Sequence, residues 1–291
     1  PISFEALEAG CARLERMGYR VIYEPSIFDR VSLFAGSVER RLREIHGMFE
    51  NPEVRAILCS RGGYGCNYLL PHLDLNLIRA NPKIFGGYSD NTSLLTYLCD
   101  TAGLVTFHAP MVTKDFAEPN GVDMEAWQAA VATGAAYDRN FGVDEVQPLR
   151  TGSADGFLYG GCLSLLCASL GTPYEIRTEG SIFFVEEVNE PAYRIDRMLM
   201  QLKLAGKLDA VQRLVFGEML NCTPSPSESL QQMILRIVDR DIPIVYGLRS
   251  GHVSGRNFTL PFGVRAHLVV ESNVRLSYEA AVMVLPRRSE K

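Results

Sequence analysis

The sequence predicts a two-domain α/β protein, because short apolar strands alternate with amphipathic helices over a long chain. Residues 54–59 form a nearly continuous apolar run, which is typical of a parallel strand covered on both faces. Helical periodicity precedes this run at residues 37–49 and recurs between later apolar runs. Strands that alternate with helices indicate a layered α/β domain. The chain has 291 residues, which is enough for two domains of ordinary size.

The first domain is predicted to span residues 1–145 and to hold a Rossmann-like or flavodoxin-like parallel sheet covered by helices. We expect helices at 3–17, 37–49 and 92–98, and strands at 19–23, 54–59, 84–85 and 104–107. A domain of this class that starts directly on a helix is unusual. We therefore expect a further strand to precede residue 1.

The second domain is predicted to span residues 146–291 and to be a mixed α/β domain with β-hairpins. The boundary is placed here because residues 112–155 contain polar turns, the single Trp127 and no strong strand pattern before Val143. Expected strands lie at 181–185, 214–216 and 242–246, expected helices at 162–170, 192–205 and 225–239, and hairpins at 264–282.

Composition and charge exclude several classes of function. The net charge is −5, and the densest basic cluster, Arg40, Arg41 and Arg43, is flanked by Glu39 and Glu44, so nucleic acid is not an expected partner. No apolar run is long enough to cross a bilayer. The seven cysteines show no CxxC motif and no Cys/His ligand spacing. We expect reduced thiols in a cytoplasmic protein, with no metal and no cofactor.

Ser89 is the candidate nucleophile. An apolar run ends at residue 85, two glycines and a tyrosine follow, and residues from Thr92 onward have helical character. A strand, a sharp Gly-rich turn carrying serine and a helix make a nucleophile elbow, which exposes the hydroxyl and aims backbone N–H groups at the atom under attack. The pattern departs from G-x-S-x-G at Asn91, a residue type that tolerates left-handed backbone. An ordinary Ser-Asp helix cap is the structural alternative.

A serine nucleophile needs a base to accept its proton. Of the five histidines, His46 falls in a charged helix, His72 in a loop and His267 in a strand. His108 and His252 follow strands, which is where sites of α/β proteins form. From position alone, a structural role as a loop histidine is equally open for both.

The base in turn needs an acid to orient it, and the candidates are Asp90, Glu186, Glu187 and Glu190. Glu186 and Glu187 end an expected strand, so their side chains point to opposite faces and at most one joins the site. A pair of exposed loop carboxylates is the structural alternative.

The glycines at positions 62, 63 and 65 favour close approach of the backbone to a developing oxyanion. A phosphate cradle would need a longer Gly-rich loop with lysine, or G-x-G-x-x-G with an acidic residue downstream. Neither pattern is present.

Short motifs occur along nearly the whole chain: residues 60–65 (SRGGYG) with 69–74 (LLPHLD), 85–90 (FGGYSD), 160–164 (GGCLS) with 171–173 (GTP), 184–187 (FVEE) with 193–197 (YRIDR), 251–252 (GH) and 260–263 (LPFG). Each motif is weak alone. In this combination and order they resemble the murein LD-carboxypeptidases and the related microcin C self-immunity peptidases.

The resemblance implies a Ser-Glu-His triad that is split between the two domains. Ser89 matches the nucleophile, His252 the base, and Glu186 the acid that orients the histidine, with Glu187 as the second choice. The backbone N–H groups of Asp90 and of a glycine at position 63 would form the oxyanion hole.

The resemblance also implies a substrate, a murein tetrapeptide stem that loses its terminal D-Ala during wall recycling, and a homodimeric enzyme. Recognition of a free terminal carboxylate needs a cation. Arg61 and Arg194 are the candidates, and both could equally be structural. The chain departs from the family where Ala109 replaces the commoner glycine and where Cys162 replaces a common asparagine.

Two alternatives remain open from the sequence. An immunity-type peptidase would cleave an aminoacyl-nucleotide and would need an aromatic platform for the base, but Trp127 lies near the domain junction. A non-catalytic two-domain binding protein would use the turns around Ser89 only to contact a ligand.

Overall fold

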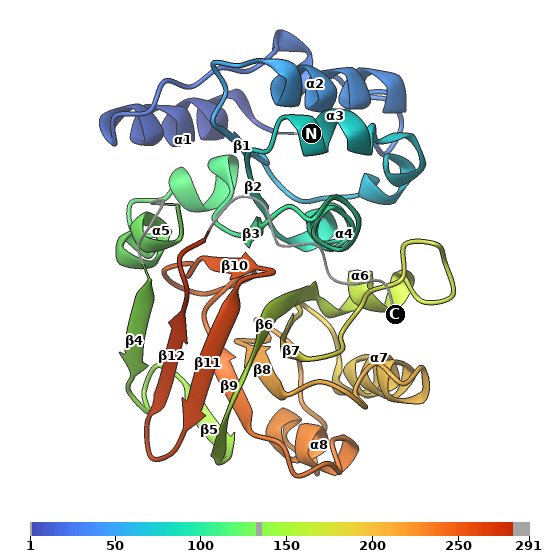
Figure 1. The fold of residues 1–291 in the computed structure, drawn as a ribbon, viewed down its shortest axis with the longest axis vertical. Coiled ribbons are helices and arrows are strands. Elements are labelled where there is room, and N and C mark those ends of the chain that lie inside the picture. The colour runs from blue at the N-terminus through green and yellow to red at the C-terminus, as the bar shows by residue number, and fades with distance from the viewer. Residues whose placement is uncertain (1, 132–135, 282–291) are drawn as a thin grey trace.

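The computed structural model describes residues 2–131 and 136–281, and the predicted two-domain α/β fold is confirmed. Figure 1 shows two stacked units, with the N-terminal unit at the top built on a four-stranded sheet and the C-terminal unit below it built on an eight-stranded sheet. Val282, at the end of the expected hairpins, lies outside the described residues.

The N-terminal sheet has the strand order β1-β2-β3-β10. Its first three strands are parallel and β10 runs antiparallel to β3. The strands are β1 (Ala56–Leu58), β2 (Ile84–Gly87), β3 (Thr106–His108) and β10 (Leu260–Phe262). The helices of this half are α1 (Phe4–Arg16), α2 (Val38–Glu50), α3 (Leu75–Ala80), α4 (Thr92–Tyr97) and α5 (Met124–Val131).

Serine caps fix the starts of α1 and α2. The Ser3 hydroxyl accepts a hydrogen bond from the Ala6 N–H, and the Ser37 hydroxyl accepts one from the Arg40 N–H. Each cap satisfies a backbone donor that the first helical turn cannot satisfy itself. The starts of both predicted helices are therefore set by local sequence.

The C-terminal sheet has the strand order β4-β12-β11-β6-β7-β8-β9-β5. Its centre, β6 to β9, is parallel, and β11 and β12 form the predicted antiparallel hairpin. The strands are β4 (Tyr137–Phe141), β5 (Gln147–Arg150), β6 (Gly152–Cys162), β7 (Ser181–Glu186), β8 (Arg213–Gly217), β9 (Ile244–Leu248), β11 (Arg265–Val270) and β12 (Val274–Tyr278). The helices are α6 (Leu163–Ala168), α7 (Ala192–Leu204) and α8 (Leu230–Ile237).

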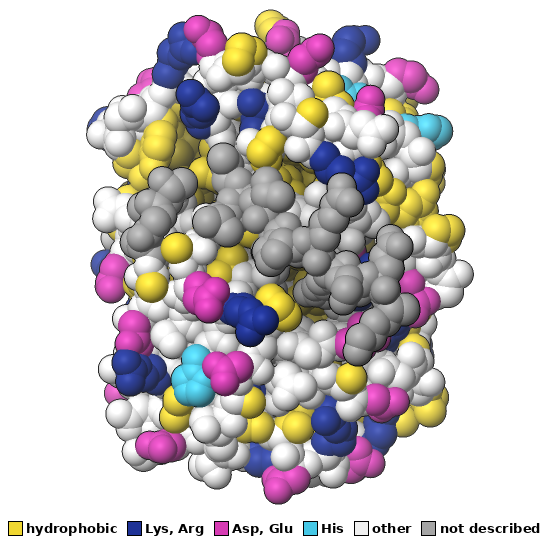
Figure 2. All heavy atoms as spheres, in the orientation of Figure 1, with side chains coloured by type: hydrophobic (Ala, Val, Ile, Leu, Met, Phe, Trp, Pro, Cys, Tyr) yellow, Lys and Arg dark blue, Asp and Glu magenta, His cyan; other side chains and the backbone are white. Residues whose placement is uncertain are grey.

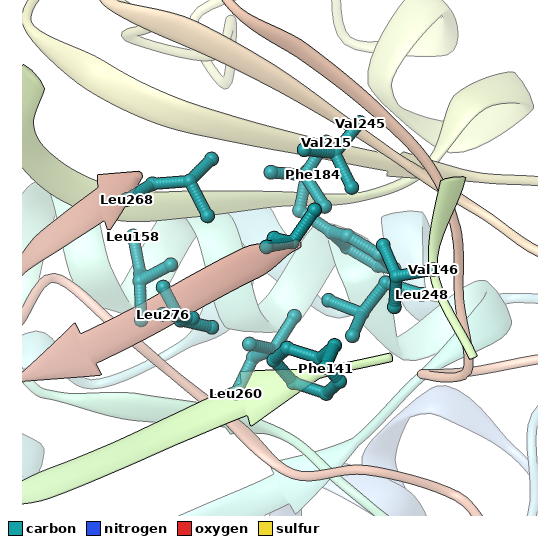
Figure 3. A pocket seen from close by; sticks show the side chains of 11 residues that line it. Phe141, Val146, Leu158, Phe184, Val215, Val245, Leu248, Leu260, Leu268 and Leu276 are labelled. Atoms are coloured by element: carbon teal, nitrogen blue, oxygen red, sulfur yellow. The ribbon is translucent and has the colours of Figure 1, made fainter. Parts of the chain in front are cut away.

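Both faces of the large sheet are buried, as the apolar run of β7 requires. Phe183 and Val185 pack into the core on the side of α6, α7 and α8, and Phe184 packs into the core on the other side. Figure 3 shows that second core, where the sheet curls so that Phe141 of β4 and Leu248 of β9 line one small cavity. Its volume is about 10 Å³ and all its lining residues are apolar, so it is a packing gap rather than a ligand site.

Two predicted features of the secondary structure are wrong. Residues 19–23 form no strand, and Tyr19, Ile22 and Tyr23 are exposed, because no neighbouring strand pairs with this segment among the described residues. A strand does occur before Val143, since β4 pairs with β12. Its three central residues, 138–140, are all polar, so the sequence shows neither the apolar run nor the alternation that is typical of a strand.

The chain crosses between the two units more than once. β4 ends before residue 145 yet belongs to the large sheet, and β10 comes from the second half of the chain yet belongs to the small sheet. Sheet membership therefore favours a division before Tyr137, with β10 returning to the first unit. We propose this division in place of one between residues 145 and 146.

The described surface carries no dominant charge of one sign on the face shown. In Figure 2, Lys and Arg side chains lie interspersed with Asp and Glu side chains. Within the described residues, no helix combines the length and the apolar character that crossing a membrane requires.

Candidate active site

Ser89 sits on a sharp turn between β2 and α4. Its backbone is left-handed, with φ of 65°, an unusual conformation for a residue with a side chain. A Cβ atom on Gly62 would lie 2.8 Å from the Ser89 Oγ, so the Gly-rich loop packs directly against the serine. The geometry is that of the predicted elbow.

Asn91 does not work as the sequence suggested. Its backbone is right-handed, with φ of −68°, so its tolerance of left-handed backbone is not used. Its side-chain amide instead donates to the carbonyl oxygens of Tyr88 (3.0 Å) and Arg61 (3.3 Å). The asparagine thus ties the Gly-rich loop to the elbow.

Hydrogen bonds also fix both ends of the Gly-rich loop, residues 60–65. At its C-terminal end, Asp90 Oδ2 accepts from the Cys66 N–H at 2.9 Å. At its N-terminal end, the Ser60 carbonyl accepts from the Thr113 N–H at 2.9 Å. Among the described residues, the backbone N–H groups of Gly63 and Asp90 donate no hydrogen bond to another protein group. Both donors are therefore available to a bound molecule.

Glu186 and His252 form a buried pair at the carboxyl edge of the large sheet. His252 Nδ1 lies 2.7 Å from Glu186 Oε2, which also accepts from the His252 backbone N–H at 3.0 Å. Burial alone would raise the pKa of Glu186, but the hydrogen bonds and charge of His252 outweigh it and lower that pKa below its usual value. Glu186 is therefore ionised and fixes the orientation of the imidazole.

Tyr88 connects this pair to the elbow. It immediately precedes Ser89, and its ring meets the His252 ring edge-on with 5.1 Å between centroids. Tyr88 is fully buried and its hydroxyl lies 3.5 Å from Asp115 Oδ1. The contact brings the serine turn of one unit beside the histidine loop of the other.

His108 lies behind Glu186, fully buried. Its Nδ1 is 2.9 Å from Ser250 Oγ, and its Nε2 is 3.9 Å from Glu186 Oε1. Burial lowers the pKa of His108 to about 4, so the ring is neutral at pH 7. His108, which is the last residue of β3, thus faces the carboxylate oxygen to which His252 does not bind.

Comparison with known proteins matches both halves of the chain to one family. The LD-carboxypeptidase N-terminal domain matches residues 1–109 and the LD-carboxypeptidase C-terminal domain matches residues 155–268. The probable murein peptide carboxypeptidase of Bacillus subtilis is 37% identical over 273 residues, which cover 89% of this chain and 83% of the relative. The chain belongs to the LD-carboxypeptidase family.

The chain is also similar to a solved structure and to an immunity protein. The crystal structure of the muramoyltetrapeptide carboxypeptidase from Oxalobacter formigenes superposes with a TM-score of 0.86 and 29% identity, and covers 97% of each chain. The microcin C7 self-immunity protein of Escherichia coli is 28% identical over 288 residues, which cover 88% of this chain and 83% of the relative.

Other predicted residues of this LD-carboxypeptidase family member have different contacts from the Glu186–His252 pair. Glu187 accepts from the N–H groups of Ser164 (2.9 Å) and Val188 (3.0 Å). Arg194 is exposed on α7 and forms an ion pair with Glu190 at 3.2 Å. The Arg61 side chain is exposed at the start of the Gly-rich loop.

Asn257 is a site-supporting residue that sequence reasoning missed. It is fully buried, and its side chain accepts from the Gly251 N–H at 3.0 Å and donates to the Gly251 carbonyl at 3.1 Å. Its own backbone bonds to Gly121 and Asp123. Asn257 thereby holds the residue before His252, and nothing in the sequence distinguishes it from an ordinary loop asparagine.

The pKa of His108 predicts a specific pH dependence of stability. Because folding lowers this pKa from about 6.5 to about 4, the unfolded chain binds more protons between these values, and the stabilisation present above pH 6.5 is lost as the pH falls. From pH 7 to pH 5 the parent should lose about 2 kcal/mol of unfolding free energy more than His108→Gln. Urea unfolding at both pH values measures the difference. Equal losses in the two proteins would contradict a neutral buried His108.

Proposed function

We propose that this protein is a serine LD-carboxypeptidase. It hydrolyses the amide bond between an L-centre diamino acid and the terminal D-Ala of murein tetrapeptides. Family membership and the printed names of the relatives from Bacillus subtilis and Oxalobacter formigenes support the reaction and the substrate class. The observation that carries the proposal is the 2.7 Å hydrogen bond between His252 and buried Glu186, beside the turn of Ser89.

In the proposed mechanism, the three side chains act as a triad. Glu186 accepts the hydrogen bond of the His252 Nδ1–H, which leaves Nε2 as the basic nitrogen. Nε2 takes the Ser89 proton as Oγ attacks the substrate carbonyl, and it then protonates the leaving D-Ala amine. Water hydrolyses the acyl-enzyme by the same proton transfers in reverse.

The oxyanion of the tetrahedral intermediate is proposed to bind the backbone N–H groups of Asp90 and Gly63. Two features support this: both donors lack a protein acceptor among the described residues, and the loop at position 62 touches Ser89. Fixed backbone donors of this kind stabilise charge only as it develops, and the loss of one typically costs roughly 10²–10³ in turnover.

The free carboxylate of D-Ala is proposed to meet an arginine. Arg61 belongs to the loop that packs on Ser89, whereas Arg194 lies on α7, away from that loop in the chain. We therefore favour Arg61 over Arg194 as the carboxylate-binding cation.

The likeness to the microcin C7 self-immunity protein keeps a second candidate, a peptidase that cleaves an aminoacyl-nucleotide. An aromatic platform for the base would favour it. Trp127 does not supply one, because its ring is buried on α5 against Phe116. Murein tetrapeptide therefore remains the favoured substrate.

The family resemblance also supports a homodimer that works in the cytoplasm, and we propose both. Sedimentation equilibrium of the purified protein would test the dimer, which predicts twice the chain mass of 32.3 kDa. A monomer at all concentrations would contradict it.

Mass spectrometry of a murein tetrapeptide incubated with the protein tests the reaction. The parent should release D-Ala, and Ser89→Ala should reduce the rate roughly 10⁴-fold or more, because the acyl-enzyme cannot form. Ser93→Ala, which changes the serine at the second position of α4, is the matched control and should retain activity. No release from the folded parent would reject the murein reaction, and equal release by Ser89→Ala would reject the nucleophile.

Glu186→Gln tests the role of the carboxylate. An amide at this position can donate to Nδ1 and so favours the wrong imidazole tautomer, which should lower kcat roughly 10³–10⁴-fold with little change in KM. The neighbouring substitution Glu187→Gln removes a carboxylate of the same length that accepts from the Ser164 and Val188 N–H groups, and it should change kcat only slightly. Steady-state kinetics on the tetrapeptide compares the two, and a larger loss in Glu187→Gln would exchange their assigned roles.

A further inference from the structure

A thiol, a carboxylate and an imidazole converge where the parallel strands of the large sheet end. Cys162 ends β6 and pairs in register with Glu186, which ends β7. His252 reaches the same point from the loop after β9. One potential ligand atom from each of the three residues lies within 4.8 Å of the others. Residues far apart in the sequence thus form a cluster that linear spacing could not predict.

We propose that this cluster is an inhibitory zinc site, in which Zn²⁺ binds Cys162 Sγ, the Glu186 carboxylate and His252. The inhibition rests on the function proposed above, whereas the binding does not.

The donor set suits zinc. Thiolate, imidazole and carboxylate are the side chains that bind Zn²⁺ in proteins, and three of them leave the fourth tetrahedral position to water. Thiolate sulfur disfavours Mg²⁺ and Ca²⁺, which prefer oxygen ligands. Modest side-chain rotation would bring ligand atoms that already lie within 4.8 Å of one another to zinc-binding distances.

A second observation points to a cation at this place. Glu186 is fully buried, and its Oε1 has no hydrogen-bond partner among the described residues, because His108 Nε2, which faces it, is 3.9 Å away and beyond hydrogen-bond distance. A buried carboxylate oxygen without a donor costs free energy. A metal ion bound to this carboxylate would supply the missing partner.

The thiol can leave its present contacts without creating a new buried orphan. Cys162 Sγ lies 3.6 Å from both oxygens of Glu187 and 3.4 Å from the hydroxyl of Ser164, a residue that is partly exposed and not buried. Glu187 would keep the N–H groups of Ser164 and Val188 as donors. Zn²⁺ binds cysteine as the thiolate, so binding to Cys162 releases the thiol proton to solvent.

Metal binding would disable the base by moving a proton. The nitrogen of His252 that faces Glu186 is Nδ1. When Zn²⁺ takes the place of the Nδ1 proton, the single proton of the neutral imidazole moves to Nε2. Nε2 is the nitrogen proposed to accept the Ser89 proton, so the serine loses its base. The net change is one Zn²⁺ bound and one proton, that of the Cys162 thiol, released.

Calorimetric titration of the full-length Ser89→Ala protein with ZnCl₂ tests the binding without turnover. Titrations in two buffers of different ionisation enthalpy should give one Zn²⁺ per chain and about one released proton. Adding Cys162→Ser, which keeps a donor to Glu187, should weaken binding roughly 10–100-fold. Adding Cys167→Ser, a buried thiol on the neighbouring helix, should leave binding unchanged.

Co²⁺ absorption and a second ligand variant show whether weaker binding in Cys162→Ser comes from a lost ligand and not from misfolding. Co²⁺ bound to the Ser89→Ala protein should show thiolate-to-metal charge-transfer absorption, which Cys162→Ser removes and Cys167→Ser retains. His252→Ala, at a partly exposed loop position, should weaken Zn²⁺ binding to a similar extent. Absence of Zn²⁺ binding, or binding that survives both ligand substitutions, would overturn the site.

Activity measurements then distinguish the proposed peptidase function from the proposed zinc site. Zn²⁺ should inhibit D-Ala release by the parent, a chelator should restore it, and Cys162→Ser should resist inhibition by roughly 10–100-fold more metal. A parent that binds Zn²⁺ but never releases D-Ala would reject the proposed function and leave the metal site standing. A parent whose activity Zn²⁺ does not change would overturn the inhibition.

Discussion

The hydrogen bond between Glu186 and His252 is the interaction on which the arrangement of the site depends. A carboxylate with no exposed surface is stable only when it is well paired, and the paired His252 comes from a different loop of the same sheet edge. Glycines make the enclosure possible. A Cβ atom on Gly217 would lie 2.6 Å from the Glu186 Cβ, and one on Gly251 would lie 2.8 Å from the Glu186 Cδ. Side chains at either position would push the carboxylate away from the imidazole.

The path of the chain places this pair opposite the serine. The segment that carries His252 begins at the end of β9 in the large sheet and ends at β10 in the small sheet. β10 pairs with β3, so that Leu260 lies opposite His108. The histidine loop is thus anchored in both units, and the two sheet edges that carry Ser89 and Glu186 are in contact through the rings of Tyr88 and His252. Such preorganisation is what electrostatic stabilisation of a transition state requires.

The sequence predicts the local parts of this arrangement better than the non-local parts. The elbow at Ser89 follows from a strand, two glycines and a helix, and the strand ending at Glu186 follows from its apolar run. By contrast, β4 and β10 are stabilised by strands that are distant in the sequence, so propensity alone does not reveal them. Residues 19–23 have strand-like composition but lack a partner strand. Asn257 could not be foreseen, because its role depends on a fold that brings its side chain to Gly251.

The sequence does not indicate Cys162 as a potential metal ligand, again because the contacts that bring it to Glu186 and His252 are non-local. Metal sites in sequence are recognised by short ligand spacing, whereas these three residues come together only because neighbouring parallel strands end at one level. The proposed triad and the proposed metal site then share Glu186 and His252. The chemistry that orients a base also offers good ligands to a soft divalent cation.

Covalent labelling with a fluorophosphonate tests most directly whether Ser89, His252 and Glu186 act as one unit. Intact-mass analysis and peptide mapping should find a single adduct on the peptide that contains Ser89. The labelling rate should fall strongly in Glu186→Gln, because the base is then misoriented. An adduct at another residue, or an unchanged rate in Glu186→Gln, would contradict the account.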